Sequence, residues 1–260
     1  MADPELSPAP ARRNRLFAVV LTVLGFGAAI GGLGVLLDRD SSSDPGVPPV
    51  TGERVVLTFG ATAQPFAPDR VCDVYVVPVD GRSEGLAARL ARALPRRVPV
   101  RAACVTPSFR LDLAALDHRR EQLDGVVVAD QLSLAFQMAR GIAPATVLGV
   151  TALDMYSSTF AADSFDFGVA KRFPQNQGFA AIATARMGVD EDLFRRLEVM
   201  AMRYVGLLYF GLPESSSPTS ALAPSIRSLE ELDLLQPQFS VPPPSAIELM
   251  AARKAFLSKK

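Results

Sequence analysis

The chain contains a single histidine, His118, among its 260 residues. It lies in a charged run, Asp117 to Glu121, whose composition is typical of a solvated helix. One imidazole does not make a metal site without several carboxylates. A Walker loop, a GxGxxG fingerprint and a CxxC pair are also missing, so phosphate cradling, dinucleotide binding and thiolate zinc sites have no support.

Four acidic residues are the other candidates for chemistry: Asp154, Asp163, Asp166 and Glu214. If they met in one cleft, they would form a carboxylate-based hydrolase site or a calcium site. Aspartate is also common in loops, where its side chain bonds to the nearby backbone. We favour this structural interpretation and keep the acidic cluster as the alternative.

Two cysteines, Cys72 and Cys104, fall in neighbouring predicted strands. A domain outside the cytoplasm would favour a disulfide between them. Parallel strands in simple register would instead separate them by roughly 17 Å, whereas a bridge needs α-carbons within about 7 Å. We therefore expect two buried thiols, unless the strands are antiparallel or strongly offset.

The N-terminal part predicts a membrane anchor and a linker. Leu16–Leu37 carries no charge and follows three arginines, which predicts a cytoplasmic segment over 1–15 and a transmembrane helix over 16–37. A cleaved signal peptide is the alternative. Residues 38–53 have the composition of a flexible linker, and residues 54–260 are expected to form an extracytoplasmic domain, on the side of the membrane opposite to the cytoplasm. The net charge of zero does not indicate the excess of positive charge that nucleic-acid binding requires.

The folded part is predicted to begin with a βαβ unit, formed by a strand Val71–Val79, a helix Ser83–Leu94 and a strand Val98–Val105. The elements expected after it are a helix over Asp112–Leu123 or beginning a little later, short extended and helical pieces over 125–139, a strand Thr146–Thr151, a hairpin-like region Phe165–Ala170, a strand Phe179–Ala185, a helix Glu191–Phe210, a short helix Ser228–Leu235 and an amphipathic terminal helix Ser245–Lys260.

Five segments carry a resemblance to a known family: Asp117–Gln122, Val147–Tyr156, Phe165–Ala170, Ala185–Met187 and Leu229–Asp233. In this order and spacing they resemble the archaemetzincins, a family of metzincin-type zinc peptidases. The resemblance implies an α+β fold with an α/β-type N-terminal half. It also implies a metzincin-like mixed sheet and an active-site helix, here preceded by one transmembrane helix.

The HExxHxxGxxH motif of such peptidases is missing from this chain. If Gly211 takes the glycine position, the ligand positions fall to Tyr204, Leu208 and Glu214, and the general-base position falls to Val205. The cysteines that resemble a second, structural zinc site in the family are missing as well. We therefore expect no zinc, and an apolar patch at Tyr204 and Leu208 in its place.

We interpret the chain as a membrane-anchored peptide-binding, protein-binding or scaffolding module that is not an enzyme, a pseudoenzyme of the zinc metallopeptidase class. A peptide is expected to pair with the strand Phe179–Ala185. The cleft would be lined by Phe179, Ile182, Tyr204 and Leu208. Two alternatives remain. One is an active metallopeptidase or other hydrolase with a non-standard site, and the other is a structural role in which the glycine-rich span pairs with envelope proteins.

Overall fold

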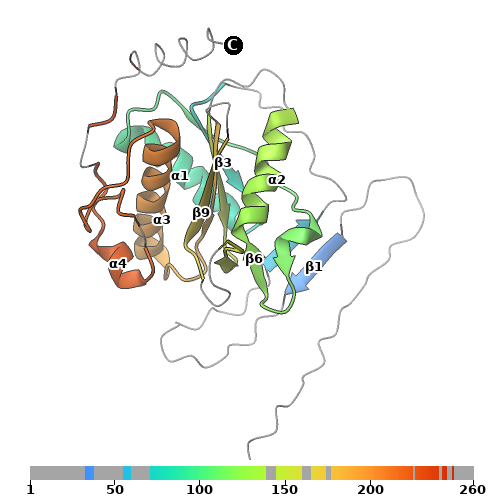
Figure 1. The fold of residues 1–260 in the computed structure, drawn as a ribbon. Coiled ribbons are helices and arrows are strands. Elements are labelled where there is room, and N and C mark those ends of the chain that lie inside the picture. Colours follow the sequence, from blue (N-terminus) through green and yellow to red (C-terminus); the bar gives the residue numbers. More distant parts are fainter. Residues whose placement is uncertain are drawn as a thin grey trace, which may run out of the picture. The chain divides into compact units, whose positions relative to one another are not determined.

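The computed structural model contains a mixed α/β domain with mixed sheets (Figure 1). The residues that it describes are 33–37, 55–59, 71–138, 145–159, 165–173, 177–224, 226–239, 242–244 and 248. All of them belong to one unit, Gly32–Lys260. Within these residues, no helix combines the length and the apolar character that crossing a bilayer requires.

Five strands form the central sheet, in the order β4-β3-β7-β10-β9. Their bounds are Ala103–Val105 for β4, Val74–Pro78 for β3, Thr146–Thr151 for β7, Gln177–Ala183 for β10 and Gly168–Phe173 for β9. The first four strands run parallel, whereas β9 pairs antiparallel with β10. β10 is therefore paired on both sides, and the predicted edge strand over Phe179–Ala185 is an interior strand. The edge is β9.

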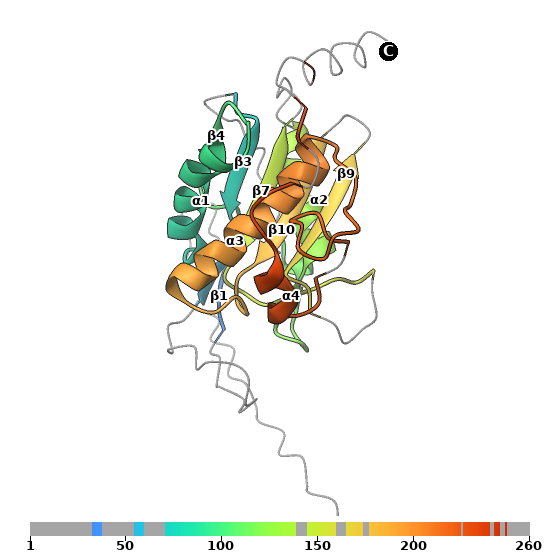
Figure 2. The same cartoon turned by 90° about the vertical axis from the view of Figure 1, so that its left-hand side faces the viewer.

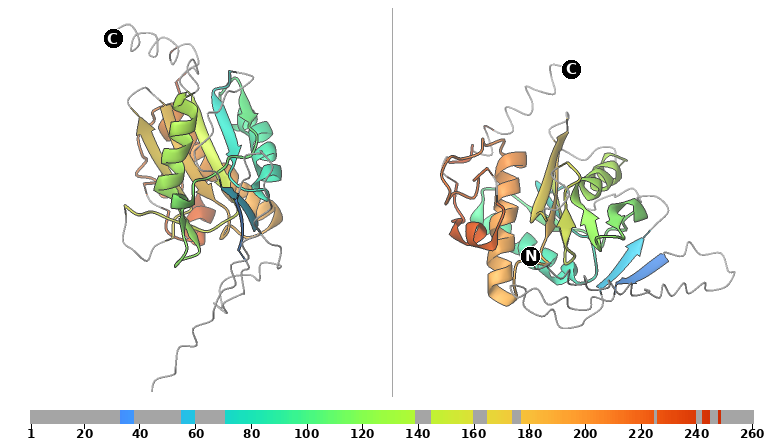
Figure 3. Two further views of the ribbon diagram at one scale, coloured as in Figure 1. Left: turned by 90° about the vertical axis from the view of Figure 1, so that its right-hand side faces the viewer. Right: turned by 60° about the horizontal axis from the view of Figure 1, so that its bottom comes forward.

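Helices cover both faces of this sheet (Figures 1 and 2). α1 (Ser83–Arg97) and α3 (Asp190–Tyr204) lie on one face. α2 (Gly125–Met138) lies on the other face, which the left view of Figure 3 presents. Alternating strand residues divide between two cores, so that Val76 packs with α1 and α3, whereas Tyr75 packs with α2.

The segment before α2 differs from its prediction. Instead of a helix over Asp112–Leu123, it forms a short 3-10 helix, η1 (Leu113–Ala115), and a hairpin of β5 (Leu116–Asp117) and β6 (Gln122–Asp124). The helix α2 begins only at Gly125, and it is one continuous helix where short extended and helical pieces were predicted. β6 pairs further with β8 (Met155–Tyr156) in a small three-stranded sheet.

Side-chain to backbone bonds explain this difference. Asp112 accepts a hydrogen bond from the Ala114 N–H at 2.8 Å, and Asp117 accepts one from the Arg119 N–H at 2.9 Å. Such local bonds compete with helix formation. The histidine, His118, is consequently an exposed residue of the turn between β5 and β6.

The C-terminal half follows its prediction more closely. α3 continues into η2 (Val205–Tyr209), a π-helical turn, and the left-handed Gly211, with a φ of 68°, comes two residues later. α4 (Leu229–Leu234) begins after Ser228, whose hydroxyl accepts a hydrogen bond from the Glu231 N–H at 3.2 Å. The expected terminal helix lies almost entirely outside the described residues.

The structure describes only a small part of the N-terminal region for which an anchor and a linker were predicted. β1 (Leu33–Leu37) pairs antiparallel with β2 (Val55–Phe59). The last five residues of the predicted span Leu16–Leu37 are therefore in a strand. Residues 1–32 and the predicted linker 38–53 lie outside the described residues.

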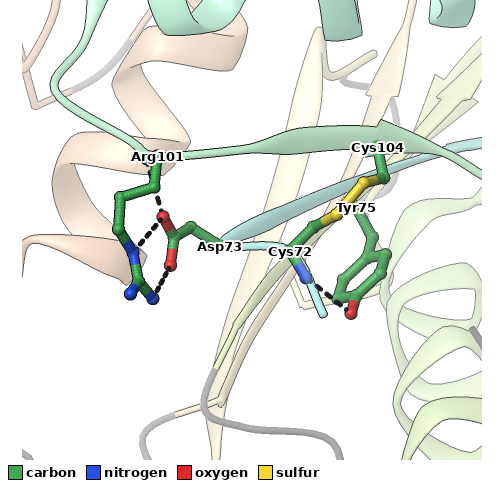
Figure 4. Close-up of a disulfide and its surroundings, with 5 residues drawn as sticks. All are labelled: Cys72, Asp73, Tyr75, Arg101 and Cys104. Carbon is green, nitrogen blue, oxygen red and sulfur yellow. Dashed lines mark hydrogen bonds and ion pairs between the residues drawn. A yellow bond between two sulfur atoms is a disulfide. The ribbon is translucent and has the colours of Figure 1, made fainter. Parts of the chain in front are cut away.

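A disulfide joins Cys72 and Cys104, whose α-carbons are 6.1 Å apart (Figure 4). The expectation of two separate thiols is therefore wrong. It assumed that the second strand begins at Val98, whereas β4 begins at Ala103, which pairs with Val74. Cys104 thus lies near the start of its strand, at the same end of β3 as Cys72.

Replacing both cysteines by alanine is expected to lower the free energy of unfolding by about 3–4 kcal/mol, because the bridge closes a loop with a sequence separation of 32. Urea unfolding followed by circular dichroism, with and without dithiothreitol, measures the effect. The reductant should destabilise the unchanged chain and leave the variant unaffected. Equal stability of the two oxidised samples would contradict the prediction.

Candidate functional site

The residues at the predicted zinc positions lie where α3 passes into η2. Tyr204 ends α3 and Val205 begins the π-helical turn, and both side chains are buried. Leu208 is half-buried and Glu214 is exposed. Single π-helical turns within helices are frequent at functional sites, which marks this segment as the candidate site.

Two glycines let the segment come close to the sheet. A β-carbon at Gly168 on β9 would lie 2.4 Å from the Tyr204 Oη, and one at Gly178 on β10 would lie 2.4 Å from the Leu208 Cβ. A side chain does not fit at either distance, so Tyr204 and Leu208 occupy the space next to these glycines. The two residues therefore pack against neighbouring strands of the sheet.

Glu214 is held by Arg203, one residue before the predicted ligand positions on α3. The Arg203 Nη2 lies 3.0 Å from the Glu214 Oε1 and 3.1 Å from the Pro224 carbonyl, and Nη1 donates to the Ala223 carbonyl. Arg203 is buried, so its charge needs these partners. Sequence reasoning missed this residue, although an arginine within an apolar helical stretch was the available signal.

These side chains do not fit a zinc ion. Leu208 has no ligating atom, and the Glu214 carboxylate is engaged by Arg203. Burial raises the pKa of the Tyr204 phenol, which keeps it protonated and unsuited to bind a cation. Within the described part of the chain, no group of three or more His, Cys, Asp or Glu side chains could hold a metal ion.

The four predicted cleft residues do not line one cleft. Phe179 packs in the core under α2, with its ring centroid 6.4 Å from that of Phe136. Ile182 and Tyr204 belong to the core on the opposite face of the sheet, and Leu208 packs against the same core. The exposed fraction is 1% for Phe179 and 0% for Ile182, so neither can line an open cleft.

The predicted acidic cluster is also divided. The Asp154 Oδ2 lies 2.6 Å from the Arg186 Nη2 and accepts a hydrogen bond from the Gln122 Nε2 at 2.9 Å. Asp154 is thus a satisfied structural residue in the loop after β7. Asp163 lies outside the described residues.

Asp166 is the member of that set with an unusual environment. It precedes β9, and its Oδ2 is buried without a hydrogen-bond partner. Burial raises the pKa of this carboxyl, and its charge in turn acts on the nearby Tyr204. A buried carboxyl whose pKa is raised by its environment is a candidate for a functional role.

Comparisons with known proteins support the fold. No family model and no curated protein matches the chain. The chain is similar to the crystal structure of an archaemetzincin from Methanopyrus kandleri, with 20% identity, coverage of 74% of this chain and 99% of that chain, and a TM-score of 0.50. It is also similar to a zinc-dependent peptidase from Methanocorpusculum labreanum strain Z, with 20% identity, coverage of 69% and 99%, and a TM-score of 0.53. The protein therefore has an archaemetzincin-like fold, as the sequence resemblance predicted.

The same similarity corrects one prediction. We expected that the chain is not an enzyme, because its zinc ligands are replaced. One of the structures with this fold is a zinc-dependent peptidase, so the comparison overturns the expectation that the fold has no enzymes behind it. The prediction was wrong because it depended on one ligand set on one helix.

Gly168→Ala is expected to lower the free energy of unfolding by about 1–3 kcal/mol, because the new methyl group collides with the ring of Tyr204. Gly85→Ala in α1 is the matched control, since nothing lies within 4 Å of its added β-carbon. There the helix propensity of alanine should raise stability by about 0.5–1 kcal/mol. Urea unfolding of both variants checks the contrast, and equal effects would contradict the close approach at Gly168.

Asp166→Asn is expected to stabilise the protein more at pH 7 than below the ordinary carboxyl pKa of 3.8. Burial raises the pKa of the folded-state carboxyl, so stability present at low pH is lost as the pH rises through that pKa. Asparagine does not ionise and avoids this loss. Urea unfolding across the pH range measures it, with the exposed residue Glu121 as a control in the variant Glu121→Gln. An unchanged pH dependence for Asp166→Asn would contradict the assignment.

Proposed function

We propose that this domain binds peptides in an extended conformation along β9. One observation carries the proposal. β9 is the last strand of the central sheet, and within the described residues no strand pairs with its outer side. The unpaired N–H and C=O groups of such an edge can accept an added strand through main-chain hydrogen bonds.

The side chains of β9 are compatible with this role. Ala170, in the middle of the strand, is exposed and small, so it does not shield the main chain. The Lys171 Nζ is held by Asp130 on α2 at 2.6 Å, on one side of the strand. The Arg172 guanidinium donates to the Leu207 carbonyl of η2, on the other side. The strand is thus held between α2 and η2, and no strand among the described residues occupies its outer edge.

Main-chain pairing does not require a metal, and we infer that the site works without zinc at Tyr204, Leu208 and Glu214. The chemistry of these side chains supports this inference. Elemental analysis by mass spectrometry of the purified protein tests it. Stoichiometric zinc that remains bound after dialysis against a weak chelator would contradict the inference. The peptide-binding proposal would not be affected, because it is tested separately.

Hydrolysis through Asp166 is a second candidate function. The observation in its favour is the buried Oδ2 without a hydrogen-bond partner, next to the start of β9. A carboxyl with a raised pKa can serve as a general acid or base in peptide hydrolysis. Cleavage of casein that is lost in Asp166→Asn and retained in Glu121→Gln would support this function. Cleavage that is equal in both variants, or missing from the unchanged chain, would exclude it.

We also propose that the folded domain lies outside the cytoplasm, held by the N-terminal apolar run with the N-terminus in the cytoplasm. The disulfide supports an oxidising compartment. Residues 16–32, which precede β1 and carry no charge, meet the lower limit of about 17 residues for a span. Carbonate extraction of membranes tests the anchor. Release of the full chain into the soluble fraction would contradict it.

Peptides that bind β9 can be isolated from a casein digest on the immobilised protein and then synthesised with N-methylated main-chain amides. Methylation of one alternate set of amides is expected to abolish binding of the peptide to the protein. The methyl groups remove the donors that pair with β9, whereas methylation of the intervening amides should leave binding within about threefold. Isothermal titration calorimetry measures both peptide series. Equal loss in the two series would show that binding does not use an added strand.

The matching change on the protein is a proline scan of β9. Ala170→Pro and Lys171→Pro affect neighbouring residues, of which one directs its N–H towards β10 and the other directs it outwards. The variant that loses the outward N–H should keep its stability and lose peptide binding. The other variant should lose stability, because it breaks the β9 and β10 pairing. If both single proline variants are stable and bind peptides as the unchanged chain does, the proposal is contradicted.

A further inference from the structure

Asp73 connects the disulfide to the candidate site. It directly follows Cys72 and is only 4% exposed. Its carboxylate accepts hydrogen bonds from the Arg101 backbone N–H at 2.8 Å and from the Arg101 Nη2 at 3.1 Å, as Figure 4 shows. A further hydrogen bond comes from the Tyr209 hydroxyl. Burial alone would raise the pKa of Asp73, but these three bonds hold it below its ordinary value.

Tyr209 is the last residue of η2, so Asp73 fixes the end of this turn. The two residues before Tyr209 contact β10 and β9, at the far end of the strand order from β4. Leu208 packs against Gly178 of β10, and the Leu207 carbonyl accepts a hydrogen bond from Arg172 of β9. The π-helical turn is therefore attached at one end to the start of β3 and along its length to the β9 edge.

β4 is the element that holds Arg101 in place. It is an edge strand of only three residues, and the Cys72–Cys104 disulfide is its covalent connection to β3. Arg101 precedes this strand by two positions and reaches back to Asp73 through both its backbone and its side chain. Figure 4 shows the disulfide and this ion pair on either side of the Cys72–Asp73 peptide.

We propose that the Cys72–Cys104 disulfide is a redox-sensitive latch that holds η2 beside the β9 edge. While the bridge is closed, β4 keeps Arg101 on Asp73, and Asp73 keeps the hydroxyl of Tyr209. When the bridge opens, the short edge strand loses its covalent tie, Asp73 loses its fixed partner, and the end of η2 is released.

The opening reaction is an exchange with a dithiol reductant. One thiolate of the reductant attacks the Cys104 sulfur, because Cys104 is half-buried whereas Cys72 is 4% exposed. The S–S bond breaks, its electron pair leaves on the Cys72 sulfur, and that sulfur takes up a proton. The second thiol of the reductant then attacks the mixed disulfide and releases Cys104 as a thiol. In total, the protein gains two electrons and two protons, and the dithiol becomes a disulfide.

Hydrogen exchange of the full chain, followed by mass spectrometry, tests the latch before and after reduction with dithiothreitol. Exchange of the η2 amides should become about tenfold faster on reduction, the change expected from loss of one hydrogen bond to a charged group. The α2 amides on the opposite face of the sheet are the internal reference. Alkylation of the two thiols confirms complete reduction.

Tyr209→Phe is the matched variant, since it removes only the hydroxyl that binds Asp73 and keeps the ring. Its η2 amides should exchange fast with the bridge closed, and reduction should add little, because the two changes break one connection. A reduction effect of equal size in the variant and the unchanged chain would overturn the latch. So would unchanged η2 exchange after complete reduction.

The consequence for peptide binding rests on the proposed function of β9. Reduction should weaken binding of the captured casein peptides by the same factor as Tyr209→Phe does. If no peptide binds under any condition, the proposed function fails while the exchange measurement still decides the latch. If peptides bind equally to the oxidised and reduced chains, the η2 turn moves without affecting the edge, and the latch has no role in binding.

Discussion

The close approach of the α3 and η2 segment to Gly168 and Gly178 is the contact on which the candidate site depends. Because both glycines lack a side chain, Tyr204 and Leu208 can lie directly against β9 and β10. The helix is then positioned by apolar packing, and the ion pair of Arg203 with Glu214 holds the chain just beyond η2. Apolar packing and one ion pair thus position this segment. The same contact positions the edge strand β9, because Tyr204 packs against Gly168, the first residue of that strand.

Two carboxylates near this segment show how partners decide the behaviour of a buried charge. Asp73 and Asp166 both experience burial that raises the pKa. Asp73 receives three hydrogen bonds, which outweigh burial and stabilise its charge. Asp166 has a buried oxygen with no donor, so burial alone determines the direction of its shift. The charge of Asp73 is therefore stabilised by its partners, whereas the charge of Asp166 is disfavoured by its environment.

Much of the helical framework could be predicted from the sequence, because the signals are local. The leucines of α1 recur at helical spacing, and Ser228 with Glu231 marks the start of α4. Gly211 has the left-handed conformation expected of a residue that ends a helix. The resemblance to archaemetzincins also led to the correct fold.

The errors concern pairings between distant segments. The register of β3 and β4, which brings Cys72 to Cys104, depends on where a three-residue strand starts. Strand order decides that β10 is interior, and no property of Phe179–Ala185 itself reveals it. The environment of Asp166 depends likewise on which groups the fold places around it. Such features arise from non-local contacts that periodicity and capping patterns do not encode.

The three contacts of Arg203 have a further consequence for the segment after η2. Because one guanidinium holds Glu214 near its beginning and the Ala223 and Pro224 carbonyls at its end, both ends of this segment are attached to α3. Ser216 and Pro218 lie between these attachments and are exposed. The segment is thus a closed surface loop whose tip can accept an inserted epitope or a fused domain without disturbing the helix beneath it.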